Sequence, residues 1–160
     1  MKKILSLTVK NHAGVISRIS SLFSGKGYSL ESLVGGTTPD LGTSDLTLVC
    51  ETDNNEFDQI KKQLNKLIDV IKVKDLSKGE IVKKELAYIK IDADHKDKQK
   101  IISITNAYDG AQITDISYES VIIEIAEDSE KINNFLTLFP DCKNIEIART
   151  GLVAMQLPRK

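Results

Sequence analysis

Residues 3–36 read KILSLTVKNHAGVISRISSLFSGKGYSLESLVGG, and this stretch decides the fold. Residues 3–9 alternate apolar and polar side chains, as a half-buried strand does. Apolar side chains then recur at helical spacing along one stripe, at Val15, Ile16, Ile19, Leu22 and Phe23. Residues 25–27 (Gly-Lys-Gly) predict a helix end with a left-handed cap, and residues 28–36 predict a second strand.

The pattern continues to residue 75 and is then repeated. A turn at residues 37–42 is followed by an alternating strand at 43–51, a helix marked by Phe57, Ile60, Leu64 and Leu67, and a strand at 70–75. The second half begins with a strand through Ala87, Ile89 and Ile91 and a helix whose apolar face is Ile101, Ile104, Thr105 and Tyr108. A hairpin at 111–117 and 120–126 follows. A helix with its stripe at Ile132, Phe135, Leu136 and Phe139 and a last strand at 142–149 complete this half. Both halves therefore have the order βαββαβ.

Two βαββαβ units predict an α+β protein with two ferredoxin-like domains in tandem, each an antiparallel sheet with its helices on one face. Residues 77–79 (Ser-Lys-Gly) form the natural boundary. The predicted domains are 1–78 and 79–160, and residues 151–160 are predicted to be a terminal tail.

Composition excludes several classes of protein. The chain has 160 residues, with 22 basic and 23 acidic side chains, so attraction to nucleic acid through phosphate neutralisation is not expected. No apolar run approaches the roughly 20 residues that a membrane span requires. Cys50 and Cys142 are far apart and show no pairing pattern, as in a reduced chain. We therefore expect a cytoplasmic protein that binds neither nucleic acid nor membrane.

Catalytic signatures are missing from the sequence. His12 and His95 are the only histidines, and the chain has no Gly-x-Ser-x-Gly, Cys-x-x-Cys or phosphate-loop motif. Two imidazoles and two thiols, all isolated, do not make a four-ligand zinc site. An RNA-binding module of this topology would carry aromatic side chains on its central strands, and here those strands offer leucines. The sequence predicts a non-catalytic chain without a metal site.

The second strand and the first helix start carry the two functional candidates. Residues 29–36 contain one charge and no proline, so this edge strand predicts a homodimer joined edge to edge, unless a loop or the second half covers it. Residues 11–14 (Asn-His-Ala-Gly) lead into the helix, whose free N–H groups suit a carboxylate. The alternative is ordinary N-capping by Asn11. His12 is either an exposed loop residue or a ligand-binding one.

At these residues the chain resembles a known family. Residues 10–19 and 22–33 are similar to the start of the small regulatory subunit of acetolactate synthase (acetohydroxyacid synthase), which begins with a small-molecule-binding ACT domain. Residues 63–70 resemble the same domain further along, and residues 85–91 and 147–151 resemble the C-terminal domain of this family. The resemblance extends through nearly the whole chain.

The resemblance implies a regulatory role in branched-chain amino-acid biosynthesis. In this family a separate large subunit holds thiamine diphosphate, magnesium and a flavin (FAD), and it condenses two pyruvates or pyruvate with 2-oxobutyrate. The small subunit, which has no cofactor of its own, activates that enzyme and confers feedback inhibition by valine or a related amino acid. The alternative is a free-standing ACT-type amino-acid sensor that acts on a different enzyme or regulator.

The family also implies an effector site at the interface of two ACT domains. One chain would supply the helix-start residues Asn11, His12, Ala13, Gly14, Val15 and Ile16, and its partner would supply the second-strand residues Ser29, Leu30, Val34 and Gly36. The family usually has Asn-Ile-Glu-Ser-Leu on that strand. This chain has Ser29 in place of the asparagine, so an amide donor is lost and effector affinity or identity is in question there.

Overall fold

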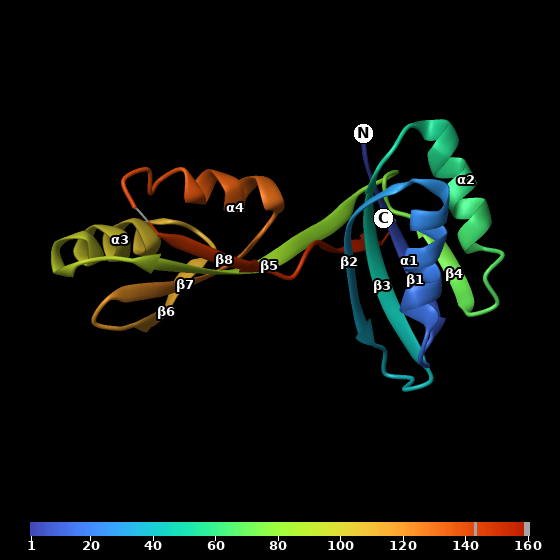
Figure 1. The fold of residues 1–160 in the computed structure, drawn as a ribbon, viewed down its shortest axis with the longest axis horizontal. Helices are drawn as coiled ribbons and strands as arrows, with labels where there is room; N and C mark the ends of the chain where they lie inside the picture. The colour runs from blue at the N-terminus through green and yellow to red at the C-terminus, as the bar shows by residue number, and fades with distance from the viewer. Residues whose placement is uncertain (143, 159–160) are drawn as a thin grey trace. The chain divides into compact units, whose positions relative to one another are not determined.

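The computed structural model describes residues 1–142 and 144–158. The chain forms two compact units (Figure 1). The first unit comprises Met1–Val82 and the described residues from Leu152 onward, and the second comprises Lys83–Gly151. In the described part of the chain, no helix is long and apolar enough to cross a bilayer.

The first unit has the predicted βαββαβ order. Its elements are β1 (Lys2–Lys10), α1 (Val15–Lys26), β2 (Ser29–Thr37), β3 (Thr43–Glu51), α2 (Asn54–Leu64) and β4 (Val70–Asp75). The sheet has the order β2-β3-β1-β4, with every neighbouring pair antiparallel. Both helices lie on one face of this sheet (Figure 1). The predicted ferredoxin-like fold is confirmed for this unit.

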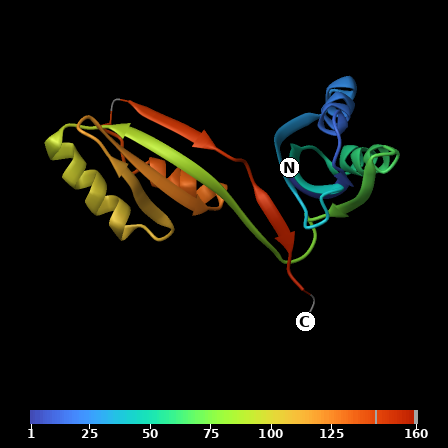
Figure 2. The same ribbon diagram turned by 90° about the horizontal axis from the view of Figure 1, so that it is seen from below.

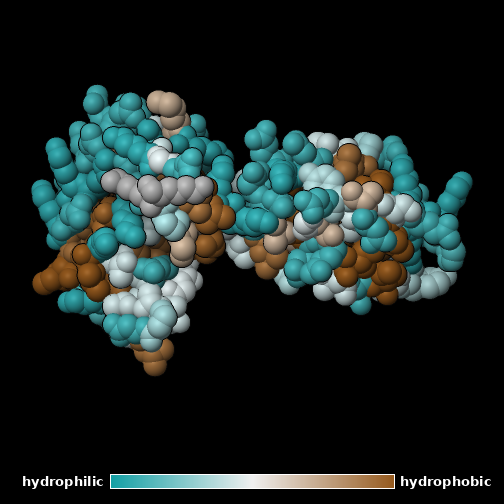
Figure 3. Space-filling model, turned by 180° about the vertical axis from the view of Figure 1, so that it is seen from behind, coloured by the Kyte–Doolittle hydropathy of each residue, from teal (hydrophilic) through white to brown (hydrophobic). Residues whose placement is uncertain are grey.

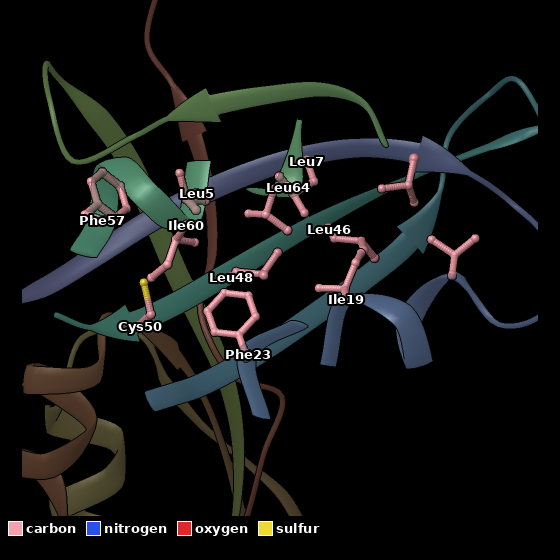
Figure 4. Close-up of a cluster of buried hydrophobic side chains, with 12 residues drawn as sticks. Leu5, Leu7, Ile19, Phe23, Leu46, Leu48, Cys50, Phe57, Ile60 and Leu64 are labelled. Atoms are coloured by element: carbon pink, nitrogen blue, oxygen red, sulfur yellow. The ribbon is translucent and has the colours of Figure 1, made fainter. Parts of the chain in front are cut away.

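The core of the first unit lies between the sheet and the two helices. Leu5 of β1 and Leu48 of β3 point toward the helices and pack against Phe23 of α1 and Ile60 of α2 (Figure 4). All four side chains are buried. Cys50 belongs to the same cluster, and burial raises the pKa of its thiol to about 11. The thiol therefore behaves as a small apolar group and stays protonated at neutral pH.

The second unit repeats the order with its own core. Its elements are β5 (Ile81–Asp92), which begins in the first unit, α3 (His95–Ala107), β6 (Ala111–Ile116), β7 (Ser120–Glu127), α4 (Ser129–Leu136) and β8 (Ile145–Arg149). The strand order is β6-β7-β5-β8. Phe135 packs edge-on between two rings, with its centroid 4.8 Å from that of Tyr108 and 5.1 Å from that of Phe139. The last strand begins at Ile145 instead of the predicted residue 142, and Lys143 lies outside the described residues.

The C-terminal segment is not a tail, which corrects the prediction for residues 151–160. A further strand, β9 (Val153–Gln156), pairs with β5, and the Leu157 N–H donates to the Glu80 carbonyl at 3.0 Å. β9 lies on the side of the first sheet away from α1 and α2 (Figure 2). A four-residue strand is too short to produce a clear period in the sequence. Residues 159–160 of the predicted tail lie outside the described residues.

The domain division at residue 78 stays a prediction. In the structure β5 is one strand from Ile81 onward, and the compact units divide after Val82. The residues from Leu152 onward, which the prediction places in the second domain, group with the first unit. Leu152 and Ala154 are buried, so this grouping hides apolar surface.

Two adjacent glycines of β2 are expected to respond differently to a methyl group. A Cβ on Gly35 would lie 2.3 Å from Cδ2 of Leu46, which is buried, whereas a Cβ on Gly36 would have no heavy atom within 4 Å. We expect Gly35→Ala to lower the free energy of unfolding by about 1–3 kcal/mol through overpacking. Gly36→Ala should leave it unchanged or raise it slightly. Urea denaturation of the two variants checks this, and equal effects would contradict it.

Candidate functional site

The start of α1 is an open helix end. Gly14 occupies the N-cap position with φ of 89°, in the left-handed region that favours glycine, and within the described chain no side chain caps this end. The Gly14 carbonyl accepts from the Arg18 N–H at 3.0 Å, so the helix ladder begins there. The N–H groups of the first turn, at Val15 and Ile16, are the kind that bind an anion.

Asn11 does not cap the helix, so that alternative is wrong. Its side-chain amide donates to the Leu41 carbonyl at 3.1 Å, and its backbone N–H donates to the Gly42 carbonyl at 2.8 Å. Asn11 therefore holds the helix-start loop (residues 11–14) against the turn between β2 and β3. The structure brings Asn11, His12, Ala13, Gly14, Val15 and Ile16 together at one end of the first unit, as neighbours in sequence must be.

A buried carboxylate that sequence reasoning missed holds the same loop from the other side. Asp69 is 5% exposed, its Oδ1 lies 3.0 Å from Nε2 of His12, and its Oδ2 pairs with Arg18 of α1. His12 also has Nδ1 3.0 Å from the Ala13 carbonyl. Asp69 therefore links the loop and the first helix to the start of β4. Nothing local in the sequence marks Asp69, because both partners come from distant residues.

The hydrogen bonds of His12 raise the pKa of its imidazole. A bond to the Ala13 carbonyl and then the bond to Asp69 raise the pKa of His12 above its ordinary 6.5. Both acceptors favour the imidazolium, in which each ring nitrogen donates. Burial acts to raise the pKa of Asp69, but the His12 bond and the Arg18 charge outweigh it and lower that pKa.

The stability of the first unit should depend on pH through His12. Because folding raises the pKa of His12, its stabilisation of the folded state is fully present below pH 6.5. This stabilisation is lost as the pH rises through the folded-state pKa. We expect the free energy of unfolding to fall over that range, and to fall less in His12→Gln. Urea denaturation at a series of pH values measures this. An unchanged slope in His12→Gln would contradict the assignment, and His95→Gln serves as the control.

The predicted β2 residues occupy different surroundings. Ser29 is exposed at the start of the strand, and Leu30 packs against the core. Gly36 lies six residues beyond Leu30, about 20 Å along a strand. Since β1 and β2 run parallel, only the far end of β2 lies near the helix start of its own chain. Ser29 and Leu30 are therefore not brought to that site, and Val34 and Gly36 instead line a groove on the open face of the sheet.

The outer edge of β2 is available for pairing. β2 is the first strand of its sheet and bonds to β3 on one side, and no strand among the described residues pairs with the other side. Glu31 lies at a β-bulge and its carboxylate pairs with Lys2 at 2.5 Å. The one charge on this strand is thus engaged within the chain, and the strand has no further charge that blunts its edge.

Large apolar side chains are exposed around the helix-start loop. Ile16 in the first turn is 55% exposed, Leu41 beside Asn11 is 77% exposed, and Ile68 next to Asp69 is 81% exposed. Figure 3 shows one face of the molecule, on which patches of hydrophobic residues lie among mostly hydrophilic ones. Apolar surface beside free N–H groups suits an amphipathic ligand or a second protein chain. In the part of the chain that the structure describes, no group of His, Cys, Asp or Glu could hold a metal ion.

The sequence matches two families over most of its length. Residues 84–158 match the family described as the small subunit of acetolactate synthase, and residues 5–72 match the AHAS small subunit-like ACT domain. The second match covers β2, β3, both helices, the helix-start loop and part of β1 and of β4 in the first unit.

Relatives of known name agree with these matches. The chain is 39% identical to a probable acetolactate synthase small subunit of Methanothermobacter thermautotrophicus, covering 95% of this chain and 90% of that protein. It is 38% identical to the acetolactate synthase small subunit of Bacillus subtilis, covering 96% and 90%. The crystal structure of the acetolactate synthase small subunit from Thermotoga maritima superposes with a TM-score of 0.89, at 33% identity, covering 100% of this chain and 99% of that one.

Proposed function

The chain belongs to the family of acetolactate synthase small subunits, and from that premise we propose that it activates the catalytic large subunit. We further propose that it binds valine or another branched-chain amino acid and that this binding inhibits the large subunit. The reaction takes place in the large subunit, with its thiamine diphosphate, magnesium and FAD. This chain contributes no cofactor. The assembly is proposed to work in the cytoplasm.

The single observation that carries the proposal is the uncapped start of α1. Gly14 is left-handed, and within the described residues no side chain occupies the cap, so the Val15 and Ile16 N–H groups are available to an effector carboxylate. Exposed Ile16 and Leu41 offer apolar surface for an aliphatic side chain. Hydrogen-bond donors for the carboxylate and an apolar wall are two of the three features that an aliphatic amino acid requires.

The third feature, an acceptor for the ammonium group, would come from a second copy of the chain. Two β2 strands pairing antiparallel about an axis near Leu33 would place the partner's Ser29 opposite Thr37, at the end of the strand nearest Gly14. The free edge of β2 supports this arrangement. The partner's strand carbonyls and Ser29 hydroxyl would then face the helix start, with Leu30 of the partner beside them.

A site shared by two chains gives a physical route to regulation. Effector binding stabilises one geometry of the dimer over others, and a coupling of about 1–3 kcal/mol is enough to change the activity of an attached enzyme several-fold. Asp69 holds the loop through His12 and holds α1 through Arg18, so the helix start is preorganised for the ligand.

The test is calorimetric titration of the full chain with valine, leucine and isoleucine, followed by activity assays with the large subunit. Gly14→Asp places a negative charge at the helix start and should abolish both effector binding and inhibition while leaving activation intact. Gly14→Asn is the matched control, because asparagine tolerates the left-handed backbone and is neutral. It should retain most of the binding.

Three outcomes would count against the proposal. No heat with any of the three amino acids in the presence of the large subunit would remove the effector role. Equal loss of binding in Gly14→Asp and Gly14→Asn would show that backbone strain, not charge, is responsible. Effector binding without association with the large subunit would favour a free-standing sensor.

A further inference from the structure

A groove on the open face of the first sheet is not explained by the effector site at α1. It has a volume of about 380 Å³, in the range of small-molecule sites, and lies wholly within the first unit. Its floor is the sheet face opposite the helices, one wall is the end of β2, and the other is β9. The lining residues that carry the argument are Ser6, Thr47, Asp45, Lys74, Gly36 and Met155.

The floor of the groove is a row of hydroxyls between two opposite charges. Ser6 of β1 lies in register with Thr47 of β3 on one side and with Lys74 of β4 on the other. Asp45 lies on β3 in the next row and accepts a hydrogen bond from Thr8 at 2.7 Å. Among the described residues neither Asp45 nor Lys74 takes part in an ion pair.

The positions of the charges set the length of a ligand. β3 and β4 flank β1 and the two residues lie in neighbouring rows, so the Cα atoms of Asp45 and Lys74 are about 12 Å apart. A molecule with an ammonium and a carboxylate on a short body could contact both. Asp45 would accept from the ammonium, Lys74 would donate to the carboxylate, and Ser6 and Thr47 would bond between them.

The walls supply apolar contact. Val34 of β2, Leu76 after β4 and the β9 residues Val153 and Met155 line the groove together. Met155 is 70% exposed and flexible, so it can close over a bound molecule without a change of backbone. Leu152 and Ala154 are buried and hold β9 in place.

From this arrangement we infer that the groove is a second ligand site, for a small zwitterion with an aliphatic body, closed on one side by the C-terminal strand. It is separate from the helix-start loop, because none of residues 11–16 lines it, although Val34 and Gly36, predicted for the effector site, line the groove. A ligand there would tie β9 to the sheet and so restrain the C-terminal segment.

The test is titration of the ¹⁵N-labelled full chain with L-valine, followed by amide chemical shifts. Gly14→Asp is used as the background, so that the helix-start site does not contribute. The inference predicts shifts at Gly35, Gly36 and Lys74. Isovalerate, which lacks the ammonium, and isobutylamine, which lacks the carboxylate, should each bind more weakly than valine, because each makes only one of the two charged contacts in the groove.

Two matched variants decide the assignment. Lys74→Gln should weaken valine binding in the groove about three-fold or more, because an exposed charged contact is worth up to about 1 kcal/mol. Lys72→Gln removes another exposed lysine of the same strand that does not line the groove, and should change the affinity by less than about two-fold. Gly36→Leu should abolish binding, because its Cβ points into open space in the groove and the added side chain fills it without a clash.

The inference is overturned if valine shifts no amide of the groove, if Lys72→Gln and Lys74→Gln weaken binding equally, or if isovalerate binds as well as valine. Failure here with valine still binding at residues 13–16 of the unmodified chain would leave the proposed effector site intact. Groove binding without binding at residues 13–16 would do the reverse.

Discussion

Replacing Arg149 with alanine is expected to lower the free energy of unfolding of the second unit by about 3 kcal/mol, because it leaves a buried carboxylate without its cation. Glu85 is 6% exposed, and its Oε1 lies 3.2 Å from a guanidinium nitrogen of Arg149. Within the described residues that oxygen has no hydrogen-bond partner, so the charge of Arg149 alone compensates it. Oε2 accepts from the Ser129 hydroxyl at 3.1 Å.

The neighbouring strand does not supply a substitute for Arg149. Glu85 of β5 lies in register with Glu127 of β7, a second buried carboxylate that pairs with Lys84 and Lys131. Two lysines already compensate Glu127, so the cost of losing Arg149 comes from the unpaired charge of Glu85 in a region of low dielectric constant.

Urea denaturation followed by a double-mutant cycle measures the effect. Glu85→Gln in the Arg149→Ala background should recover part of the lost stability, because the uncompensated charge is then removed. Lys90→Ala is the control, since its ion pair with Glu146 is exposed and should contribute less than about 1 kcal/mol. A cost for Arg149→Ala as small as that of Lys90→Ala would contradict the argument.

Phe135→Ala, in the core of the second unit, should lower the free energy of unfolding of that unit by about 3–5 kcal/mol. Phe135 is fully buried and packs edge-on against Tyr108 and Phe139. Its removal therefore leaves a cavity and ends two aromatic contacts. Because the first unit has a separate core, protection there should be preserved.

Native-state hydrogen exchange distinguishes the two units. In Phe135→Ala, amide protection should fall in β7 and in the part of β5 after Lys83, and should remain in β1 and β3. Leu48→Ala, in the core of the first unit, should give the opposite pattern. If either variant lowers protection evenly through both units, the chain unfolds as one cooperative body and the division into two units has no thermodynamic meaning.

In the second unit, as in the first, charge compensation is built from residues that are far apart in the chain. Asp69 is held by His12 and Arg18, and Glu85 by Arg149. Asp69 joins the start of β4 to the helix-start loop and α1, and Glu85 joins β5 to the last residue of β8. Such a pair often adds little net stability over an apolar replacement, whereas the loss of one partner is costly. In the first unit the arrangement that Asp69 favours is the one that presents the open helix end.

The sequence by itself determined the element order of both units and which faces are buried. Alternation at Leu5 and Leu7 and helical spacing at Ile19 and Phe23 are short-range patterns, so they can be recognised without knowing what they pack against. The helix-start loop was also predictable, because Gly14 lies directly before the apolar stripe. Family resemblance added the role of that loop, which periodicity does not contain.

Only the tertiary structure decided which single side chains meet. Asp69, His12 and Arg18 come together through the pairing of β4 with β1, and no local pattern marks such a contact. The position of β9 is decided in the same way, because four residues carry too weak a period to predict a strand, and its partner β5 begins more than seventy residues earlier. The physical reason is that periodicity reflects burial averaged along an element, whereas a site depends on individual long-range contacts.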